Sequence, residues 1–410
     1  MLYGCIGEVL KHSFSKEIHN KIADYKYEIK EVKKDEFDSF MKAKDFVGIN
    51  VTIPYKEMII PYLDEVDDMA KTIGAVNTVV NKNGKLYGYN TDFYGMKMLI
   101  ERIGISLENK KVAILGSGGT SKTANAVVSS LGAKTIIKVS REKKGEFITY
   151  DELYSAYNDV EVVINTTPLG MYPNVDKSPV DLSKFLKLQG AVDVVYNPIK
   201  TEFIRQAKAL GVKADTGLYM LVMQAVKASE IFMDKKYDIS IGEKIYSEIF
   251  SLKQNVVLTG MPGSGKTTVG KILKDLLNKE FVDTDELIEK KENSSIKEIF
   301  SIHGEKYFRE LEKSVIEEVS KKNGQIISTG GGAILNEENV KNLKLNGKVF
   351  FLDRDVSEIV PTDDRPLSSN VYDLKKRYEE RYPLYSSTAD VVIKVDVDEN
   401  SVANKIVRSL

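Results

Sequence analysis

Lys266 and Thr267 end the segment GMPGSGKT (260–267), which fits the phosphate-loop pattern GxxxxGK[ST]. An apolar, strand-like run precedes this segment and a helical pattern follows it. The loop N–H groups would cradle phosphates, the lysine would reach the β- and γ-oxygens, and the threonine hydroxyl would hold Mg²⁺. A glycine turn without a ligand has no use for this lysine and threonine. The predicted ATP-binding residues of the loop are Gly263, Ser264, Gly265, Lys266, Thr267 and Thr268, with Lys266 also predicted to be catalytic.

A second glycine-rich segment, GSGGT (116–120), follows the apolar run KVAIL. Gly116 allows a tight turn, and Gly118 and Gly119 let the backbone approach a pyrophosphate at a helix N-terminus. The GxG pattern alone is weak, because glycine also serves ordinary turns between a strand and a helix. Its place between a strand and a helix strengthens it, so we predict a dinucleotide site here and keep the simple turn as the alternative.

The charged residues after the next strand-like run bear on which dinucleotide binds. Ser140-Arg141, with Lys143 and Lys144 behind them, stand where an NAD-binding domain normally carries an acidic residue. A cationic fork suits a 2′-phosphate, so NADP(H) is favoured. Glu142 is a counter-signal that leaves NAD open, and a solvated charged loop is the bland alternative. The predicted NADP-binding residues are Gly116, Ser117, Gly118, Gly119, Thr120, Ser140, Arg141, Lys144 and Gly217.

Strand-like and helical segments alternate along the chain, which predicts an α/β fold class with mainly parallel sheets. Strands are expected at 111–116, 134–140, 160–165 and 191–196, as in a doubly wound Rossmann-type domain. At 410 residues the chain is too long for one ordinary core. The predicted domains are a substrate-binding α/β domain over 1–104 completed by a helix over 218–250, an NADP-binding Rossmann domain over 105–217, and a P-loop domain with a central parallel sheet over 253–410.

The bulk composition excludes several classes of protein. The 59 Lys+Arg balance 60 Asp+Glu, so no global field draws the chain to nucleic acid or to a membrane. One cysteine, Cys5, gives no disulfide framework, and three histidines without HExxH argue against zinc chemistry. The first residues lack the pattern of a signal peptide and no apolar run could span a bilayer, so we expect a cytoplasmic protein. A homo-oligomer is compatible with this composition.

The segments outside the two loops carry a family resemblance. Seven of them occur in order over residues 1–250: HSFSKEIHN (12–20), NVTIPYK (50–56), GAVNT (74–78), GYNTDFYG (88–95), INTTPLGM (164–171), VVYNPIKT (194–201) and GLYMLVMQ (217–224). Together they resemble shikimate dehydrogenase. The resemblance implies reduction of 3-dehydroshikimate to shikimate with NADPH. The substrate is then a small ring acid, held by hydroxyl and amide groups of the protein.

The same resemblance implies roles for individual residues. Lys56 and Asp92 match the catalytic pair, in which an ammonium supplies a proton to the developing alkoxide. Without the surrounding segments, Lys56 would be interpreted as a solvated surface lysine and Asp92 as the N-cap of a helix. Lys16, Ser140 and Tyr219 depart from the family pattern and put cofactor affinity and pocket shape in question. The implied substrate-binding residues are Ser13, Ser15, Thr52, Asn77, Asp92, Tyr196 and Gln224.

The second part of the chain resembles shikimate kinase over roughly 255–410. The segments are FVDTDELIE (281–289), IFSIHGEKYFRELE (299–312), STGGGA (328–333), DRPL (364–367) and RYPLY (381–385). By this resemblance Asp285 receives the attacking hydroxyl and is catalytic, Asp283 joins Thr267 at the metal, and Arg365 closes on ATP phosphates. The chain is shorter than the family pattern between Leu352 and Arg365 and again between Leu367 and Arg381. The implied acceptor-binding residues are Asp285, Arg309, Gly331, Gly332 and Arg381.

Each of these positions also has a bland alternative. Asp283 and Asp285 could cap a helix, and Arg309 could be one half of an i,i+3 pair with Glu312. Taken together, the segments predict a bifunctional enzyme that makes shikimate with NADP(H) and then phosphorylates it with ATP and Mg²⁺. A quinate/shikimate dehydrogenase fused to another small-acid kinase is the alternative. A regulatory protein with inactive sites is disfavoured because Lys56, Asp92, Lys266 and Asp285 are all present.

Overall fold

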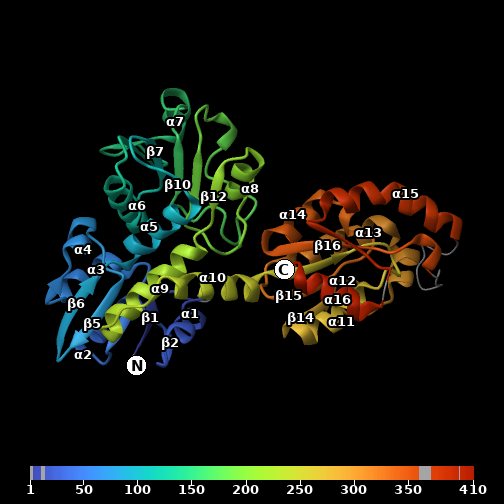
Figure 1. Ribbon diagram of the computed structural model, residues 1–410, viewed down its shortest axis with the longest axis horizontal. Helices are drawn as coiled ribbons and strands as arrows, with labels where there is room; N and C mark the ends of the chain where they lie inside the picture. Colours follow the sequence, from blue (N-terminus) through green and yellow to red (C-terminus); the bar gives the residue numbers. More distant parts are fainter. Residues whose placement is uncertain (1–2, 11–13, 360–370, 397) are drawn as a thin grey trace. The chain divides into compact units, whose positions relative to one another are not determined.

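Figure 1 shows the computed structural model, which describes residues 3–10, 14–359, 371–396 and 398–410. The chain divides into two compact units, Met1–Ile249 and Phe250–Leu410, and each has hydrophobic core clusters of its own. This division lies three residues before residue 253, where the predicted P-loop domain begins.

The first unit begins with a six-stranded sheet of order β2-β1-β3-β5-β6-β4. β1 pairs in parallel with β2 and β3, whereas β5 runs antiparallel to both β3 and β6. β5 and β6 form a hairpin, because Asn83 and Gly84 between them both have positive φ, as a two-residue hairpin turn requires. The elements of this part are β1 (Tyr3–Gly7), α1 (Ser15–Ile22), β2 (Tyr27–Glu31), α2 (Lys34–Ala43), β3 (Gly48–Val51), α3 (Tyr55–Met58), β4 (Glu65–Val66), α4 (Asp68–Ile73), β5 (Thr78–Lys82), β6 (Lys85–Tyr89) and α5 (Thr91–Ile103).

A second sheet of the first unit has the order β12-β11-β10-β7-β8-β9, and all its strands are parallel. Its central strands fall within a few residues of the predicted ranges, although β11 ends at Asp193 rather than at 196. The side chain of Asp193, the last residue of β11, accepts hydrogen bonds from the Val195 N–H and from the Thr201 hydroxyl group. The elements are β7 (Lys111–Leu115), α6 (Gly119–Ser130), β8 (Thr135–Val139), β9 (Phe147–Ile148), α7 (Tyr150–Ala156), β10 (Val162–Asn165), β11 (Gly190–Asp193), α8 (Glu202–Ala209) and β12 (Lys213–Asp215).

Helices α5 and α9 (Leu218–Met233) pack along each other between these two sheets (Figure 1). The close approach needs a glycine, because a Cβ on Gly95 would lie 2.4 Å from the carbonyl oxygen of Met220. The expected single helix over 218–250 is wrong. Asp234 takes a left-handed conformation (φ 48°) and ends α9, and a separate helix α10 (Ser240–Lys253) follows.

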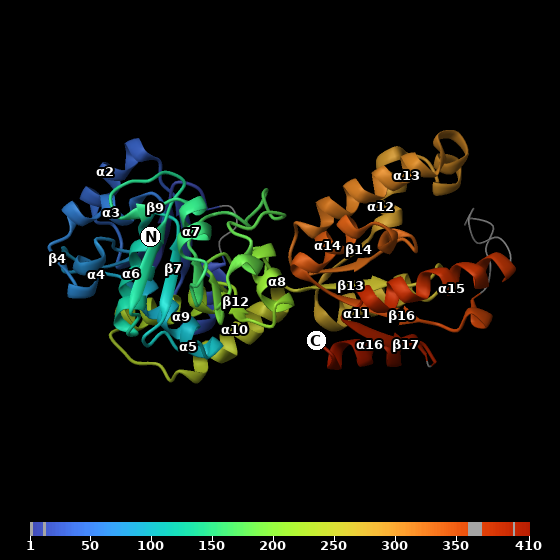
Figure 2. The same ribbon diagram turned by 90° about the horizontal axis from the view of Figure 1, so that it is seen from above.

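The second unit has a five-stranded parallel sheet of order β14-β15-β13-β16-β17. α11 and α16 pack on one face of this sheet, and α12, α13 and α14 pack on the other (Figure 2). Each of these two layers contains a hydrophobic core cluster. The elements are β13 (Asn255–Thr259), α11 (Lys266–Leu277), β14 (Glu280–Asp283), α12 (Thr284–Glu292), α13 (Ile296–Ser320), β15 (Gln325–Ser328), α14 (Glu337–Asn346), β16 (Gly347–Asp353), α15 (Val371–Thr388), β17 (Val391–Lys394) and α16 (Glu399–Arg408).

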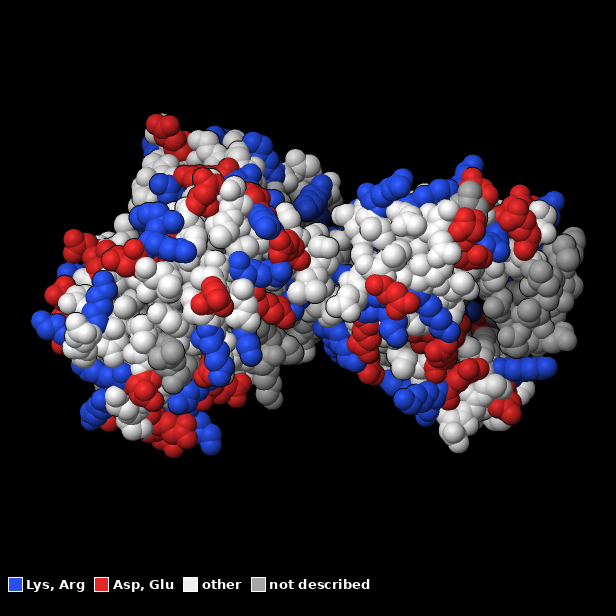
Figure 3. All heavy atoms as spheres, turned by 60° about the horizontal axis from the view of Figure 1, so that its bottom comes forward, with Lys and Arg blue, Asp and Glu red and all other residues white. Residues whose placement is uncertain are grey.

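Charges of both signs are interspersed over the face of the molecule in Figure 3, in keeping with the near-zero net charge. Within the described part of the chain, no helix has the length and apolar character that crossing a bilayer would demand.

Candidate active sites

The first unit contains a cavity of about 570 Å³ whose walls come from both halves of the unit. Six of the seven predicted substrate-binding residues line it, and so does the predicted catalytic Lys56. Ser13 lies outside the described residues. The predicted residues that the structure brings together in this cavity are Ser15, Thr52, Lys56, Asn77, Asp92, Tyr196 and Gln224.

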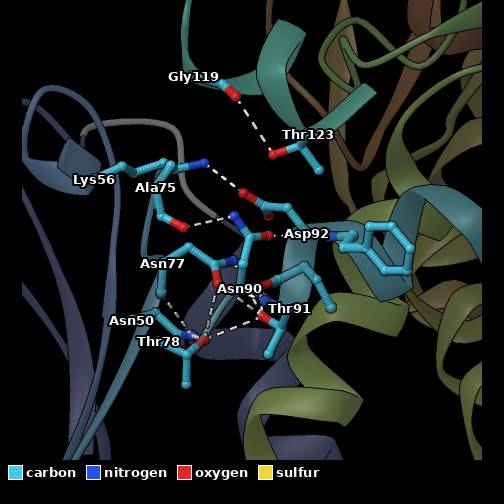
Figure 4. A network of polar contacts seen from close by, with 12 residues as sticks. Asn50, Lys56, Ala75, Asn77, Thr78, Asn90, Thr91, Asp92, Gly119 and Thr123 are labelled. Carbon is cyan, nitrogen blue, oxygen red and sulfur yellow. Dashed lines mark hydrogen bonds and ion pairs between the residues drawn. The ribbon is translucent and has the colours of Figure 1, made fainter. Parts of the chain in front are cut away.

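Lys56 and Asp92 form an ion pair inside this cavity. Lys56 lies on α3, Asp92 is the second residue of α5, and Nζ lies 2.6 Å from Oδ2 (Figure 4). Both side chains are largely buried, with 17% and 11% exposed, so the lysine is not a solvated surface residue. Asp92 is not the N-cap of α5 either. Asn90 caps the helix through Oδ1, which accepts from the Phe93 N–H at 3.1 Å.

Beside this pair, a separate network of hydrogen bonds joins residues of β3, β5, α5 and α9 (Figure 4). Asn50 Nδ2 donates to Thr78 Oγ1 at 3.0 Å, and Asn77 Oδ1 accepts from the Thr91 N–H at 2.7 Å. Thr91 Oγ1 lies 3.4 Å from Gln224 Oε1 on α9. Asn50 and Thr91 were not among the predicted site residues, although both stand inside quoted segments, where a polar residue at the end of a strand or the start of a helix was the available signal.

A second cavity of the first unit, of about 920 Å³, contains the GSGGT turn. Its lining includes Ser140, Arg141 and Lys56. Cβ atoms on Gly118 and Gly119 would meet nothing within 4 Å, so the backbone at the start of α6 is open to a ligand. The predicted cofactor residues that line this cavity are Gly116, Ser117, Gly118, Gly119, Thr120, Ser140 and Arg141.

Two predicted cofactor residues do not line this second cavity. Lys144 forms an isolated bridge with Phe147. Gly217 lines the smaller cavity, where a Cβ would lie 2.2 Å from the carbonyl oxygen of Val194, so close backbone packing explains this glycine. Lys143, beside Lys144, pairs with Glu152, and Glu142 is absent from the residues that line the cavity.

The two cavities meet at three residues. Ile53, Lys56 and Thr120 line both of them. A dinucleotide in the larger cavity and a small acid in the smaller one would therefore both reach Lys56. The arrangement can bring a hydride donor and a proton donor to one carbonyl group.

The phosphate loop of the second unit lines a cavity of about 660 Å³. Lys266 Nζ donates to the carbonyl oxygens of Gly260 and Met261 at 3.0 and 2.9 Å. Gly265, which precedes α11, has φ 94°, a conformation that favours glycine. Ser264 is fully buried and does not line the cavity. The predicted ATP-binding residues that line it are Gly263, Gly265, Lys266, Thr267 and Thr268, and Arg365 lies outside the described residues.

The two predicted magnesium ligands lie together. Thr267 Oγ1 donates to Asp283 Oδ2 at 3.0 Å, and the other oxygen of Asp283 accepts from the Asp285 N–H at 3.0 Å. Asp283 therefore does cap α12 and faces the phosphate loop as well. Burial, followed by the charges of Asp283 and Glu312, raises the pKa of Asp285 to about 7. Within the described residues, Asp285 Oδ1 is buried and has no hydrogen-bond partner.

The predicted acceptor-binding residues surround Asp285. Arg309 forms ion pairs with Glu312 and Glu305, both at 2.9 Å. The i,i+3 pair of Arg309 with Glu312, which was the structural alternative for this arginine, is therefore present, and both residues line the cavity. Arg381 Nη1 donates to the carbonyl oxygen of Gly331 at 2.9 Å. A Cβ at Gly332 would lie 2.2 Å from Arg309 Nη1, so this glycine leaves room for the guanidinium group in its present position. The lining residues Glu312 and Arg377 were missed, although Glu312 ends one of the quoted segments.

Known proteins resemble both units of this chain. A family model described as shikimate dehydrogenase substrate binding domain matches residues 5–79, and one described as shikimate kinase matches residues 262–410. A protein named shikimate dehydrogenase (NADP(+)), from Clostridium perfringens strain 13, is 42% identical over 265 residues. These cover 60% of this chain and 98% of that protein.

Solved structures give the same result for the first part of the chain. Shikimate dehydrogenase 1 from Peptoclostridium difficile has a TM-score of 0.56 at 38% identity and covers 60% of this chain and 97% of its own. A shikimate 5-dehydrogenase from Thermus thermophilus, solved in complex with NADP(H) and shikimate, has a TM-score of 0.55 at 29% identity. That match covers 60% of this chain and 99% of the other.

Proposed function

Because the chain belongs to the shikimate dehydrogenase family over 60% of its length and carries a shikimate kinase domain in residues 262–410, we propose that it catalyses two successive reactions. The first is the NADPH-dependent reduction of 3-dehydroshikimate to shikimate. The second is the MgATP-dependent phosphorylation of shikimate at its 3-hydroxyl group. The observation that carries the first proposal is the buried pair of Lys56 and Asp92 at the junction of the two cavities.

In the dehydrogenase reaction, bound NADPH supplies a hydride to the carbonyl carbon of the substrate. Lys56 then gives a proton from Nζ to the carbonyl oxygen, which would otherwise become an alkoxide. Asp92 holds the ammonium group in place, 2.6 Å away, and hydrogen-bonds the neighbouring hydroxyl group of the substrate. Asn77, Gln224 and Thr52 hold the remaining polar groups of the ring acid.

The cofactor cavity supports NADP(H) over NAD. Arg141 lines the cavity, as a residue that pairs with a 2′-phosphate must, whereas Glu142 does not line it. The open backbone at Gly118 and Gly119 fits the pyrophosphate at the N-terminus of α6.

In the kinase reaction, bound MgATP supplies the phosphoryl group. Thr267 and Asp283 would hold the metal, and Lys266 would neutralise charge on the phosphates. Asp285 accepts the proton of the attacking hydroxyl through the oxygen that has no partner among the described residues. Arg309, which lies beside Gly332, and Arg381, which lies beside Gly331, would bind the carboxylate of the acceptor.

A single set of assays tests this proposal. Purified chain is given 3-dehydroshikimate with NADPH or NADH, with and without MgATP, and shikimate and its phosphate are both measured. We expect NADPH oxidation that depends on 3-dehydroshikimate, and phosphate product only when MgATP is present. Absence of substrate-dependent NADPH oxidation would contradict the dehydrogenase assignment. A higher kcat/KM for quinate than for shikimate in the reverse direction would favour the quinate alternative.

A further inference from the structure

A tyrosine that follows β9 brings a hydroxyl group to the cofactor cavity, and the proposed function does not use it. Tyr150, the first residue of α7, lines this cavity together with Ser140 and Arg141. It is half-buried, and its hydroxyl group forms no hydrogen bond with any residue that the structure describes. Burial raises the pKa of the Tyr150 hydroxyl, so the group keeps its proton at neutral pH and can donate it in a hydrogen bond.

The register of β8 and β9 places Tyr150 beside Arg141. The two strands are parallel, Val139 pairs with Ile148, and each of these is the last residue of its strand. Arg141 and Tyr150 each lie two residues beyond that pair. The Ser140 N–H donates to the Ile148 carbonyl oxygen at 2.9 Å and so continues the pairing past the strand ends. Both residues therefore follow the carboxyl edge of the sheet, which is where doubly wound domains bind their ligands.

A capping box fixes the start of α7 and with it the backbone of Tyr150. Thr149 Oγ1 accepts from the Glu152 N–H at 3.2 Å, and Glu152 Oε2 accepts from the Thr149 N–H at 3.0 Å. Lys143 forms an ion pair with the same Glu152 carboxylate. The loop that follows β8 is thereby tied to the start of α7.

A phosphate group on the cofactor ribose would need hydrogen-bond donors, and few are available beyond β8 and β9. The Ser140 hydroxyl already donates to a carbonyl oxygen of its own loop. Lys143 is paired, and Lys144 does not line the cavity. Arg141 forms no ion pair with any of the described residues. Its guanidinium group and the Tyr150 hydroxyl are therefore the donors that this part of the cavity wall can offer.

We propose that Tyr150 is a cofactor-selecting residue, whose hydroxyl group donates to the 2′-phosphate of NADP(H) alongside the guanidinium group of Arg141. The inference rests on the proposed NADP-dependent dehydrogenase and adds a residue to its cofactor site. A hydrogen bond to a charged phosphate is stronger than one to the neutral ribose hydroxyl that NAD(H) carries at the same position. Tyr150 then supplies the second donor that the sequence led us to expect from Lys144.

The test is Tyr150→Phe, which removes only the hydroxyl group. Binding of NADP⁺ and of NAD⁺ to the full chain is measured by calorimetry. We expect Kd for NADP⁺ to rise about tenfold, because a hydrogen bond to a charged group is lost. Kd for NAD⁺ should stay within about twofold, because that ligand has no 2′-phosphate. An unchanged Kd for NADP⁺, or an equal rise for both cofactors, would overturn the proposal.

Tyr154→Phe is the matched control on the same helix. Tyr154 lies four residues after Tyr150, and its hydroxyl accepts from the Asp181 N–H at 2.7 Å. It does not line the cofactor cavity, so Kd for NADP⁺ should not change. An equal rise of this Kd in both variants would refute the proposal, because the effect would then come from a displacement of α7.

Enzyme kinetics provide a second measurement. In Tyr150→Phe, KM for NADPH should rise about tenfold, whereas kcat and KM for 3-dehydroshikimate should stay within about twofold, because Tyr150 does not line the substrate cavity. A fall in kcat with KM for NADPH unchanged would contradict the role. A parent chain without dehydrogenase activity would overturn the proposed function, and the two Kd values would still decide the role of Tyr150. A parent chain that binds NAD⁺ as tightly as NADP⁺ would overturn this inference together with the NADP assignment.

Discussion

At the scale of single residues, the first unit places a lysine where it can be a proton donor and not a surface charge. Lys56 is held by Asp92 inside a largely buried ion pair, and α3 and α5 supply the two partners. Breaking such a pair leaves the other charge buried and unpaired, so a change at either residue affects both.

We predict that Lys56→Met lowers kcat of the dehydrogenase by about 10²–10⁴-fold, the usual contribution of a positioned general acid. KM for NADPH should change little. A thermal melt of the same chain, with and without NADPH, serves as the control for folding of the first unit. A variant that keeps more than a tenth of the parental kcat would show that the proton comes from another donor.

Asp285 provides a pH-dependent prediction in the second unit. Its pKa is raised to about 7, chiefly by burial, and as a base it must be deprotonated. Kinase kcat/KM should therefore rise as pH increases through about 7 and then level off, and Asp285→Asn should abolish the activity. A pH profile from about 5.5 to about 9, with dehydrogenase activity followed in parallel, measures this. A profile flat across that range would contradict the role.

The same pKa shift has a consequence for stability. The folded-state pKa lies above the usual value of about 3.9 for an unfolded aspartate, so the second unit loses stability as pH rises from about 4 to 7. Asp285→Asn should then raise the free energy of unfolding at pH 8 by roughly 1–3 kcal/mol. Denaturant titration at pH 4 and pH 8 would separate this effect from a change independent of pH.

At the scale of elements, the contact of α5 with α9 holds together residues from distant parts of the sequence. Asp92 and Thr91 begin α5, Gln224 lies on α9, and Gly95 lets the two helices touch. The position of α9 therefore controls the shape of the substrate cavity.

We predict that Gly95→Ala destabilises the first unit by about 1–3 kcal/mol, because the added methyl group meets the Met220 carbonyl oxygen and the Gln224 side chain. Gly119→Ala is the contrasting variant. Its Cβ meets nothing in the structure, so the unit should stay stable while KM for NADPH rises. Thermal melts and NADPH titrations distinguish the two, and an equal loss of stability in both would refute the packing argument.

The elements also show which parts of the sites could be predicted from sequence. Both glycine loops were predictable because the chemistry of each lies within one short segment. The family prediction, which rested on the segments outside the loops, is confirmed. The hydrogen-bond network from Asn50 to Gln224 was not predictable from local pattern, because it joins β3, β5, α5 and α9 only after folding. Lys144 was predicted to bind NADP because of its charge. Charge alone does not predict whether a loop residue lines the cavity, and Lys144 does not.

At the scale of the whole molecule, each unit has its own core and its own ligand cavities. Ligands should therefore stabilise the units separately. In calorimetry, we expect NADPH to raise the free energy of unfolding of the first unit and MgATP that of the second. Each increase should be about 2.7 kcal/mol at a ligand concentration of about 100 Kd. Movement of both transitions by either ligand alone would show that the two units unfold together.

Joining two units in one chain also affects how a cell can balance the two reactions. Every copy of the chain brings one dehydrogenase site and one kinase site, so gene dosage cannot change their ratio. Only the catalytic constants can, which places selection for balanced flux on the residues of the two sites. The units also share a lifetime, because a lesion that unfolds either one exposes the whole polypeptide to degradation.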